Sequence, residues 1–249
     1  MPDRRLRIAV VSSPRSGNSW IRSTLSGALD MREIAVHNYL EAPSDLPERC
    51  FLQVHWYREP NFQEWLRARD FRIMTISRHP LDVLISVLHY IRYEPGTSRW
   101  LEGNAELPEA FIKSTPGSQE FINYATSFGA ENLLSISYQW WHENQVIKVR
   151  YEDAVSDPAR VLGLLVQDLG GDPKSVVPWL ERLSLKNMQK LPNRHGWQGR
   201  PGLWRKLIIP FDAIRIFRRH RTIFQEFGYS VMPYILSRKT ALRNWHELI

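Results

Sequence analysis

Short apolar runs that alternate with longer helical patterns constrain the fold of this chain more than any other feature. Each run is four to seven residues long and is bounded by polar or turn residues. The runs cover residues 8–11, 51–54, 71–77 and 146–149. Runs of this length and composition are typical of buried strands. Their alternation with helical patterns predicts an α/β fold with a mainly parallel central sheet flanked by helices.

Helical patterns occupy stretches that follow these runs. Residues 18–29 and 80–91 carry apolar side chains mostly at three- and four-residue spacing. Asp157 is expected to cap a helix that begins at Pro158. A last long helix is expected over residues 211–227.

Length and composition favour a single domain over residues 1–249. A chain of this size buries one large core, and 43% hydrophobic with 24% charged residues is an ordinary globular composition. Two stretches rich in proline and glycine, residues 93–118 and 191–203, are expected to form irregular lids or acceptor loops. No apolar stretch approaches the roughly 18 residues of a membrane-spanning helix. We therefore expect a cytoplasmic protein.

The formal net charge of +7 fits nucleic acid, an anionic membrane surface or a small anionic ligand, and charge alone does not choose among them. The only cysteine, Cys50, excludes an intramolecular disulfide and a thiolate metal site, and no metal is expected. Basic residues concentrate on the last predicted helix, at Arg215, Arg218, Arg219 and Arg221. They form either a solvated face or a contact with an anionic membrane or a polyanionic acceptor.

The segment SSPRSGNSW, residues 12–20, follows the first predicted strand and opens a helix. At such a turn, backbone N–H groups converge on the helix N-terminus, where an anion is favoured. Gly17 allows close approach of the backbone, Arg15 supplies charge, and Asn18 and Ser19 supply hydrogen-bonding groups. The segment lacks the lysine pattern of nucleotide triphosphatases, and nothing in it obviously holds magnesium. It is either a phosphate-binding loop or a structural turn.

Two further polar residues are expected at the carboxyl ends of strands, where open α/β sheets bind ligands. Arg78 follows the third apolar run and His55 follows the second. Of the eight histidines, only His55 and His79 are expected at such a position. A histidine near its unperturbed pKa suits proton removal from an alcohol, so His55 is the candidate general base. The alternative is a surface or structural histidine.

Residues 12–20 resemble the 5'-phosphosulfate loop of sulfotransferases that use 3'-phosphoadenosine 5'-phosphosulfate (PAPS), usually written Pro-Lys-Ser-Gly-Thr-Thr-Trp. The matching positions are Pro14, Ser16, Gly17 and Trp20. Arg15 replaces the lysine, and Asn18 and Ser19 replace the two threonines. The resemblance spans roughly residues 8–228 and implies a P-loop-like turn that binds the cofactor. It implies that Arg15 bridges the leaving phosphate and the sulfuryl group, and that Trp20 packs against adenine unless it is a core residue.

Arg78 and Ser86, eight residues apart, resemble the family's 3'-phosphate motif, which distinguishes PAPS from ordinary adenine nucleotides. Taken alone, Ser86 would be a helix-packing serine. Tyr151 corresponds to a residue that contacts adenine. Residues 197–205 are a degraded counterpart of the loop that closes over the 3'-phosphate, with Gly199 and Arg200 as the implied ligands.

The family's Lys-Thr-His triplet, whose histidine is the base, corresponds here to Gln53, Val54 and His55. The resemblance therefore implies His55 and Arg15 as catalytic residues. It implies in-line transfer of a sulfuryl group from PAPS to a hydroxyl or amine, with release of 3'-phosphoadenosine 5'-phosphate (PAP). A P-loop-like kinase and a non-catalytic nucleotide- or nucleic-acid-binding module are the alternatives. The acceptor is expected to be a small molecule, a sugar or a lipid-linked compound rather than nucleic acid, and the oligomeric state stays open.

Overall fold

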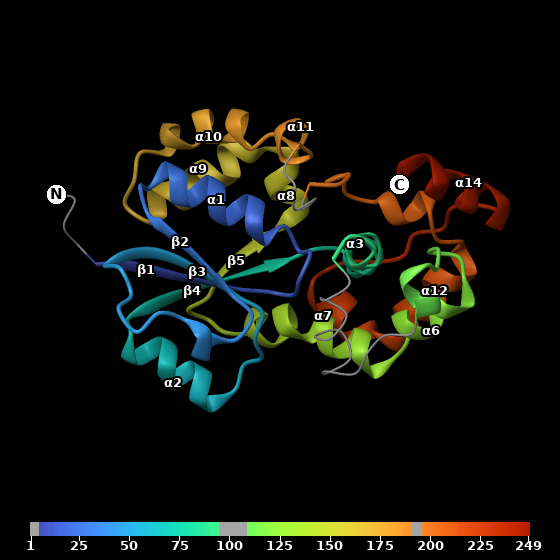
Figure 1. Ribbon diagram of the computed structural model, residues 1–249, viewed down its shortest axis with the longest axis horizontal. Helices are drawn as coiled ribbons and strands as arrows, with labels where there is room; N and C mark the ends of the chain where they lie inside the picture. Colours follow the sequence, from blue (N-terminus) through green and yellow to red (C-terminus); the bar gives the residue numbers. More distant parts are fainter. Residues whose placement is uncertain (1–4, 95–108, 191–195) are drawn as a thin grey trace. The chain divides into compact units, whose positions relative to one another are not determined.

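The structure is a computed structural model that describes residues 5–94, 109–190 and 196–249 (Figure 1). The chain separates into two compact units. The sheet unit comprises Met1–Arg78 and Ile136–Gln198, and the helical unit comprises His79–Ser135 and Gly199–Ile249. That residues 1–249 act as a single domain stays a prediction.

The expected lids are only partly described. Residues 95–108 of the first and residues 191–195 of the second lie outside the described residues. The described remainder of the first contains the short helix α5 (Glu109–Ile112), and the second leads into the 3-10 helix η4 (Leu203–Lys206).

A five-stranded sheet forms the centre of the sheet unit, and all of its strand pairs within the described residues are parallel. Its strands are β1 (Leu6–Val11), β2 (Arg32–Val36), β3 (Arg49–Val54), β4 (Phe71–Ser77) and β5 (Ile147–Arg150). Their spatial order is β2-β3-β1-β4-β5, so β1 is central. The predicted α/β fold with a mainly parallel sheet is confirmed.

The strand β2 is the one strand of this sheet that the sequence does not predict. It lies at the edge of the sheet, and each of its residues is exposed or half-buried. It therefore lacks the continuous apolar run that marks a strand covered on both faces. Its short length and charged residues suit an edge position.

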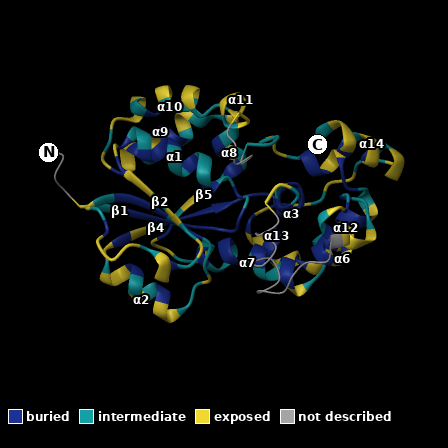
Figure 2. Cartoon of the chain, viewed as in Figure 1, coloured by how far each residue is buried: buried dark blue, intermediate teal, exposed yellow. Residues whose placement is uncertain are grey.

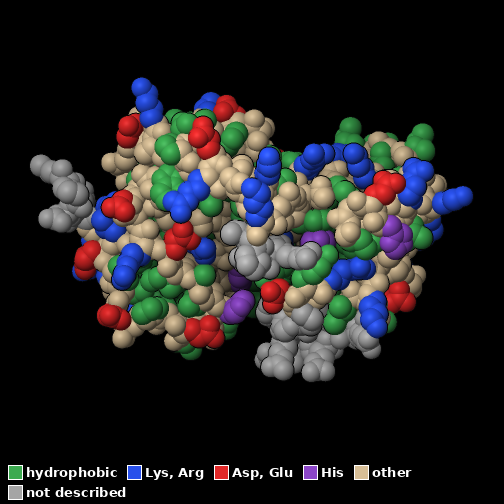
Figure 3. All heavy atoms as spheres, turned by 45° about the horizontal axis from the view of Figure 1, so that its top comes forward, with side chains coloured by type: hydrophobic (Ala, Val, Ile, Leu, Met, Phe, Trp, Pro, Cys, Tyr) green, Lys and Arg blue, Asp and Glu red, His purple; other side chains and the backbone are tan. Residues whose placement is uncertain are grey.

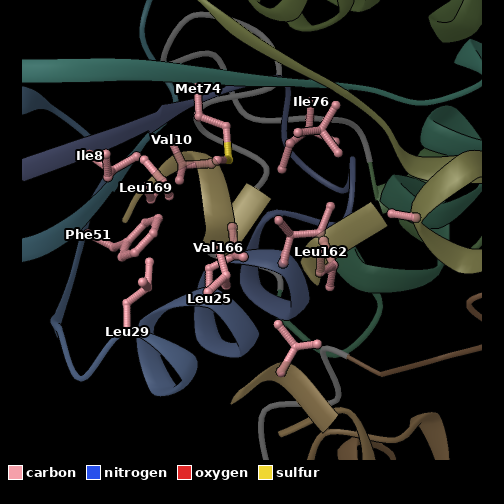
Figure 4. Close-up of a cluster of buried hydrophobic side chains, with 14 of the residues drawn as sticks. Ile8, Val10, Leu25, Leu29, Phe51, Met74, Ile76, Leu162, Val166 and Leu169 are labelled. Carbon is pink, nitrogen blue, oxygen red and sulfur yellow. The ribbon is translucent and has the colours of Figure 1, made fainter. Parts of the chain in front are cut away.

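Side chains alternate along β1 between two apolar faces. Ile8 and Val10 join a buried cluster with Leu25 of α1 (Asn18–Ala28) and Leu162 of α9 (Pro158–Asp168), shown in Figure 4. The same cluster includes Ala154 of α8 (Tyr151–Ser156). After α9 the chain continues through η3 (Pro173–Val176), α10 (Val177–Arg182) and α11 (Leu185–Met188).

The opposite face of the sheet buries Ala9 and Val11. It is covered by η1 (Tyr39–Glu41), α2 (Pro60–Ala68) and the end of α7 (Phe128–Trp141). Phe62 of α2 and Trp140 of α7 are buried here, with ring centroids 5.7 Å apart in an edge-to-face arrangement. Figure 2 shows the central strands buried and the outer faces of the flanking helices exposed. Burial of both sheet faces explains the apolar runs.

The helical unit begins with α3 (Pro80–Ile91), which coincides with the predicted helix and is buried along most of its length. It also contains α5, α6 (Gln119–Ala125), the first part of α7, η4, α12 (Pro210–Arg219), α13 (Arg221–Glu226) and α14 (Arg238–Leu248). In the sheet unit, the predicted start of α9 is confirmed, since a carboxylate oxygen of Asp157 accepts the Arg160 N–H at 3.3 Å.

The prediction of one helix over residues 211–227 is wrong. The chain leaves the helical conformation at His220 (φ −113°, ψ 28°), which separates α12 from α13. The ring of His220 is buried, and its Nε2 lies 2.8 Å from the Ala125 carbonyl oxygen. Ile214 of α12 is exposed.

Candidate active site

The carboxyl ends of the parallel strands bring the candidate residues of the sheet unit to one edge of the sheet. The loop of residues 12–17 follows the central strand β1, His55 follows β3, Arg78 follows β4 and Tyr151 follows β5. The next two strands along the chain, β2 and β3, lie on one side of β1, whereas β4 and β5 lie on its other side. Ligands bind at such a switch point in open α/β sheets.

A buried serine network holds the loop after β1. The Oγ of Ser12 accepts the N–H of Ile76 at 2.8 Å. Ser13 and Ser137 each donate a backbone N–H to the hydroxyl of the other, at 2.7 and 3.2 Å. Ser137 also donates its hydroxyl to the Ile76 carbonyl at 2.8 Å. The loop is thus fixed from β4 and α7 before any ligand arrives.

The loop has the backbone geometry of an anion-binding turn. Arg15 has φ 65° and Gly17 has φ 98°, both in the left-handed region. Turns of this kind direct successive N–H groups to one point. Gly17 is also the N-cap of α1, and no side chain in the described part of the chain caps this helix. The first amides of α1 are thus available to an anion.

Close packing at Gly17 leaves no room for a side chain unless the Tyr151 ring moves. A Cβ at this position would lie 2.4 Å from Cδ2 of the Tyr151 ring. The Trp20 ring meets Tyr151 edge to face, with centroids 6.3 Å apart. Trp20 is half-buried and packs against the cluster of Figure 4. It therefore has a part in the core, and its contact with adenine stays a prediction.

The other predicted loop residues differ in exposure. Asn18 is buried and donates its Nδ2 to the Ser13 carbonyl at 2.9 Å, while its Oδ1 has no hydrogen-bond partner among the described residues. Ser16 is buried, and Ser19 is half-buried. Asn18 thus holds the loop, and its binding of a ligand stays a prediction.

Arg78 is a buried cation with few protein partners. One Nη1–H donates to the Arg15 carbonyl at 2.8 Å, and the guanidinium carbon lies 4.4 Å from the Tyr151 ring centroid. Its Nε and the neighbouring Ser77 hydroxyl are buried without hydrogen-bond partners among the described residues. No carboxylate in the described part of the chain forms an ion pair with Arg78.

His55 is held in one tautomer. Its Nδ1 lies 2.7 Å from the Ser12 carbonyl oxygen, which can only accept, so Nδ1 carries the proton and Nε2 is the basic atom. Burial lowers the pKa of His55 from 6.5 to about 4, although the bond to Ser12 opposes the shift. Positive charge on Arg22 and Arg15 lowers this pKa further, as does His37. The imidazole is therefore neutral at pH 7 and able to accept a proton.

The sequence reasoning overlooked residues that contact this site. His37 directly follows β2, so the expectation that only His55 and His79 stand at strand ends is wrong, and it failed because β2 was not predicted. Arg22 donates its Nη1–H to the Gln53 Oε1 at 2.9 Å, and Gln53 lies beside His55. The Ser137 contacts also link distant parts of the chain, which spacing alone does not reveal.

The helical unit carries the remaining predicted residues. Ser86 is buried in α3, whereas Gly199 is half-buried and Arg200 is exposed. The buried carboxylate of Asp82, also in α3, accepts the N–H of Gly202 at 2.6 Å and that of Trp204 at 2.9 Å. The described part of the closing loop is thus tied to the helix that carries Ser86. A joint contact of Ser86 and Arg78 with one phosphate stays a prediction.

A parallel sheet with an anion-binding turn after its central strand and a basic histidine at the end of the adjacent strand is typical of α/β enzymes that bind phosphorylated ligands. A family model of the sulfotransferase domain matches residues 6–196, which is most of the chain. The chain therefore belongs to the sulfotransferase domain family and is an enzyme of the PAPS-dependent sulfotransferase class.

Solved structures show the same fold. The mouse sulfotransferase SULT7A1 complexed with PAP gives a TM-score of 0.62 at 17% identity, over 91% of this chain and 90% of that one. Retinol dehydratase in complex with androsterone and the inactive cofactor PAP gives a TM-score of 0.60 at 13% identity, over 94% and 84% of the two chains. At these identities the likeness establishes the fold alone. A search of curated proteins finds no match.

Proposed function

We propose that the site binds PAPS and transfers its sulfuryl group to a hydroxyl or amine of the acceptor. The observation that carries this proposal is the buried guanidinium of Arg78, which has no carboxylate partner among the described residues. A buried cation is costly unless an anion compensates it, so the position favours an anionic ligand. The left-handed turn at Arg15 and Gly17 and the open amides of α1 support the same ligand.

Each part of the cofactor has proposed partners. The 5'-phosphosulfate binds the loop of Arg15, Ser16, Gly17, Asn18 and Ser19. Adenine contacts Trp20 and Tyr151, whose rings already lie together. The 3'-phosphate binds Arg78 and Ser86, with Gly199 and Arg200 as further ligands. No metal takes part in the proposed reaction.

The proposed reaction is an in-line displacement at sulfur. The acceptor oxygen or nitrogen forms a bond to sulfur while the bond between sulfur and the bridging 5'-phosphate oxygen breaks, and PAP leaves with that electron pair. The acceptor proton passes to Nε2 of His55, since Nδ1 keeps its proton on the Ser12 carbonyl. Arg15 stabilises the negative charge that develops on the bridging oxygen.

The test is a transfer assay with PAPS and a panel of small-molecule, sugar and lipid-linked hydroxyl and amine acceptors, in which mass spectrometry detects the mass gain of a sulfate. We expect His55→Ala to abolish transfer and to retain PAP affinity, because His55 removes a proton and does not hold the nucleotide. Near-normal turnover of this variant, or loss of PAP binding, would contradict the role of His55. Tight PAP binding with no transfer to any acceptor would favour the non-catalytic module.

No observation favours a kinase, because the lysine of the nucleotide triphosphatase pattern is absent from residues 12–20. No helix within the described residues is both long and apolar enough to cross a membrane. A cytoplasmic location is part of the proposal.

We also propose that the helical unit contacts anionic membranes through α12. Residues 199–249 contain ten lysines and arginines and three acidic residues, so the net charge of this segment equals the net charge of the whole chain, +7. The preceding 198 residues are therefore neutral overall. Basic side chains lie beside hydrophobic ones on the surface of this unit in Figure 3.

One face of α12 combines apolar and basic groups. Phe211, Ile214, Arg215 and Arg218 follow helical spacing and are all exposed, and Phe211 leaves 71% of its surface accessible. Neither arginine forms an ion pair within the described part of the chain. An exposed aromatic ring beside two arginines suits the headgroup layer of an anionic bilayer.

Sedimentation with vesicles tests the membrane contact. We expect binding to phosphatidylcholine vesicles that contain phosphatidylglycerol and none to phosphatidylcholine alone. Phe211→Ala and the double variant Arg215→Gln/Arg218→Gln should each weaken vesicle binding several-fold. The first removes the apolar ring that inserts into the bilayer, and the second removes positive charge that attracts the anionic lipid. Arg67→Gln, an exposed arginine of the sheet unit, is the control. Equal binding to neutral vesicles, or no effect of Phe211→Ala, contradicts the proposal. If Phe211→Ala has no effect, the basic residues of α12 bind a soluble polyanion instead of a membrane.

A further inference from the structure

A chain of hydrogen bonds runs from β2 through α1 to the candidate base. Glu33 Oε2 accepts the Nε–H of Arg22 at 2.8 Å, and Arg22 Nη1–H donates to Gln53 Oε1 at 2.9 Å. The Gln53 amide nitrogen lies 3.4 Å from Nε2 of His55, whose Nδ1 lies 2.7 Å from the Ser12 carbonyl. All of these residues belong to the sheet unit.

Arg22 determines which end of the Gln53 amide meets His55. A glutamine amide presents oxygen or nitrogen equally well unless its partners distinguish them. Here the oxygen accepts from a guanidinium, which is always charged and never an acceptor. If the Gln53 amide were reversed, its NH2 group would face the Arg22 guanidinium, and two donors would oppose each other. The NH2 group of Gln53 is therefore held towards Nε2 of His55.

The Arg22 side chain is well placed for such a role. It is only 13% exposed, and Glu33 anchors its Nε end while Gln53 takes its Nη1. A cation on the amide oxygen also polarises the amide, which makes its N–H groups stronger donors. At 3.4 Å the bond from Gln53 to Nε2 is long, so an acceptor hydroxyl that donates at normal distance displaces it. The amide is then free to donate to an oxygen of the reacting groups.

We infer that Arg22 is a positioning residue for sulfuryl transfer: it acts through Gln53 to hold a polarised N–H donor beside the basic nitrogen of His55. The inference rests on the proposed function. In this arrangement the positive charge of Arg22 lies one side chain away from the reacting atoms, and the neutral amide of Gln53 lies between them. The charged and titratable groups that bear on His55 are Arg22, Arg15 and His37, and Glu33 compensates Arg22.

Steady-state kinetics of Arg22→Met test this role. Methionine keeps the length of the side chain and removes its charge and donors. We expect kcat to fall about 10- to 100-fold, the loss typical of a misaligned supporting group. The KM for PAPS and the affinity for PAP should stay within about twofold. Ser23→Ala is the matched control, because Ser23 donates to the same Glu33 oxygen but does not contact Gln53.

A second variant separates this role from simple destabilisation. Gln53→Lys in the Arg22→Met background places a cationic donor directly beside His55 and should restore kcat at least tenfold over Arg22→Met. Lack of rescue in a folded double variant, an equal loss in Ser23→Ala, or wild-type kcat in Arg22→Met would each overturn the inference.

Titration of the His55 ring by NMR gives a readout that needs no turnover. Removal of the Arg22 charge should raise the pKa of His55, and Ser23→Ala should leave it unchanged. If the protein binds no PAP and transfers no sulfuryl group, the proposed function fails, yet this titration still shows whether Arg22 acts on His55. An unshifted pKa in Arg22→Met overturns the link between them.

Discussion

At the residue scale, the environment of His55 selects a neutral imidazole with its lone pair on Nε2. The Ser12 carbonyl fixes the tautomer, and burial together with the nearby cations disfavours the charged form. A base with a lowered pKa is weak in the ground state but is always ready to accept a proton at neutral pH. In the proposed mechanism, His55 therefore acts through its position rather than through intrinsic basicity.

The pH dependence of kcat/KM follows from this pKa. Because the free imidazole has a pKa of about 4, kcat/KM should stay level from neutral pH down through 6.5 and fall only as the pH approaches about 4. A pH–rate profile with a fixed acceptor measures this. A fall centred near 6.5 would show that His55 is solvated like a free histidine or is not the base.

The same lowered pKa has a consequence for folding. A histidine whose pKa is lower in the folded state contributes stability above the unfolded value of 6.5 and loses it as the pH falls towards about 4. Urea unfolding at several pH values in this window should therefore show a smaller decline for His55→Gln than for the wild type. Parallel declines would contradict the lowered pKa of His55. The buried His220, whose pKa is also lowered, contributes equally to both curves.

At the scale of elements, the turn from β1 into α1 combines a left-handed backbone with close packing. Both features fall on Gly17, which has φ 98° and lies against the Tyr151 ring. Gly170 provides a comparison within the same chain. It has φ 88°, but a Cβ there would meet nothing within 4 Å.

The pair Gly17→Ala and Gly170→Ala separates strain from packing. Gly170→Ala should cost about 1 kcal/mol of unfolding free energy, from the left-handed backbone alone. Gly17→Ala should cost roughly 1–3 kcal/mol more, because the new methyl group overlaps the Tyr151 ring, and it should also weaken PAP binding. Chemical denaturation and calorimetry measure the two effects. Equal costs for the two variants would contradict the close contact.

The elements that the sequence predicts are those whose residues are buried on both sides. β4 and α3 coincide with their predicted bounds because apolar runs and helical spacing mark them clearly. β2 was not predicted, since an exposed edge strand has no such mark, and the break at His220 depends on a contact with Ala125 that lies 95 residues away. Local patterns do not contain that information.

The residues of the candidate site also divide into those whose position the sequence predicts and those whose position it does not. Arg78 and His55 were predictable because each directly follows an apolar run, and parallel strands bring their carboxyl ends together. Arg22 and Ser137 were not, because their roles depend on which helix face meets which strand. The resemblance to the family supplied Ser86, Gly199 and Arg200, which sequence physics alone does not select.

At the scale of the whole molecule, charge and function are unevenly distributed along the chain. The sheet unit carries the proposed base His55, the loop of residues 12–17 and Arg78, whereas the excess positive charge lies in residues 199–249. Overall basicity is therefore a poor guide to the cofactor. The specific arrangement of Arg78 and the loop, rather than net charge, favours an anionic ligand at this edge of the sheet.

Calorimetric titration with PAP, its 2'-phosphate isomer and ATP tests whether the site selects PAP. We expect PAP to bind with a dissociation constant of tens of micromolar or below, and the isomer and ATP to bind at least about tenfold more weakly, a difference of about 1.4 kcal/mol. Arg78→Ala should weaken PAP binding by about tenfold or more. Absence of PAP binding, or ATP binding as tight as that of PAP, would rule out a site that recognises PAPS.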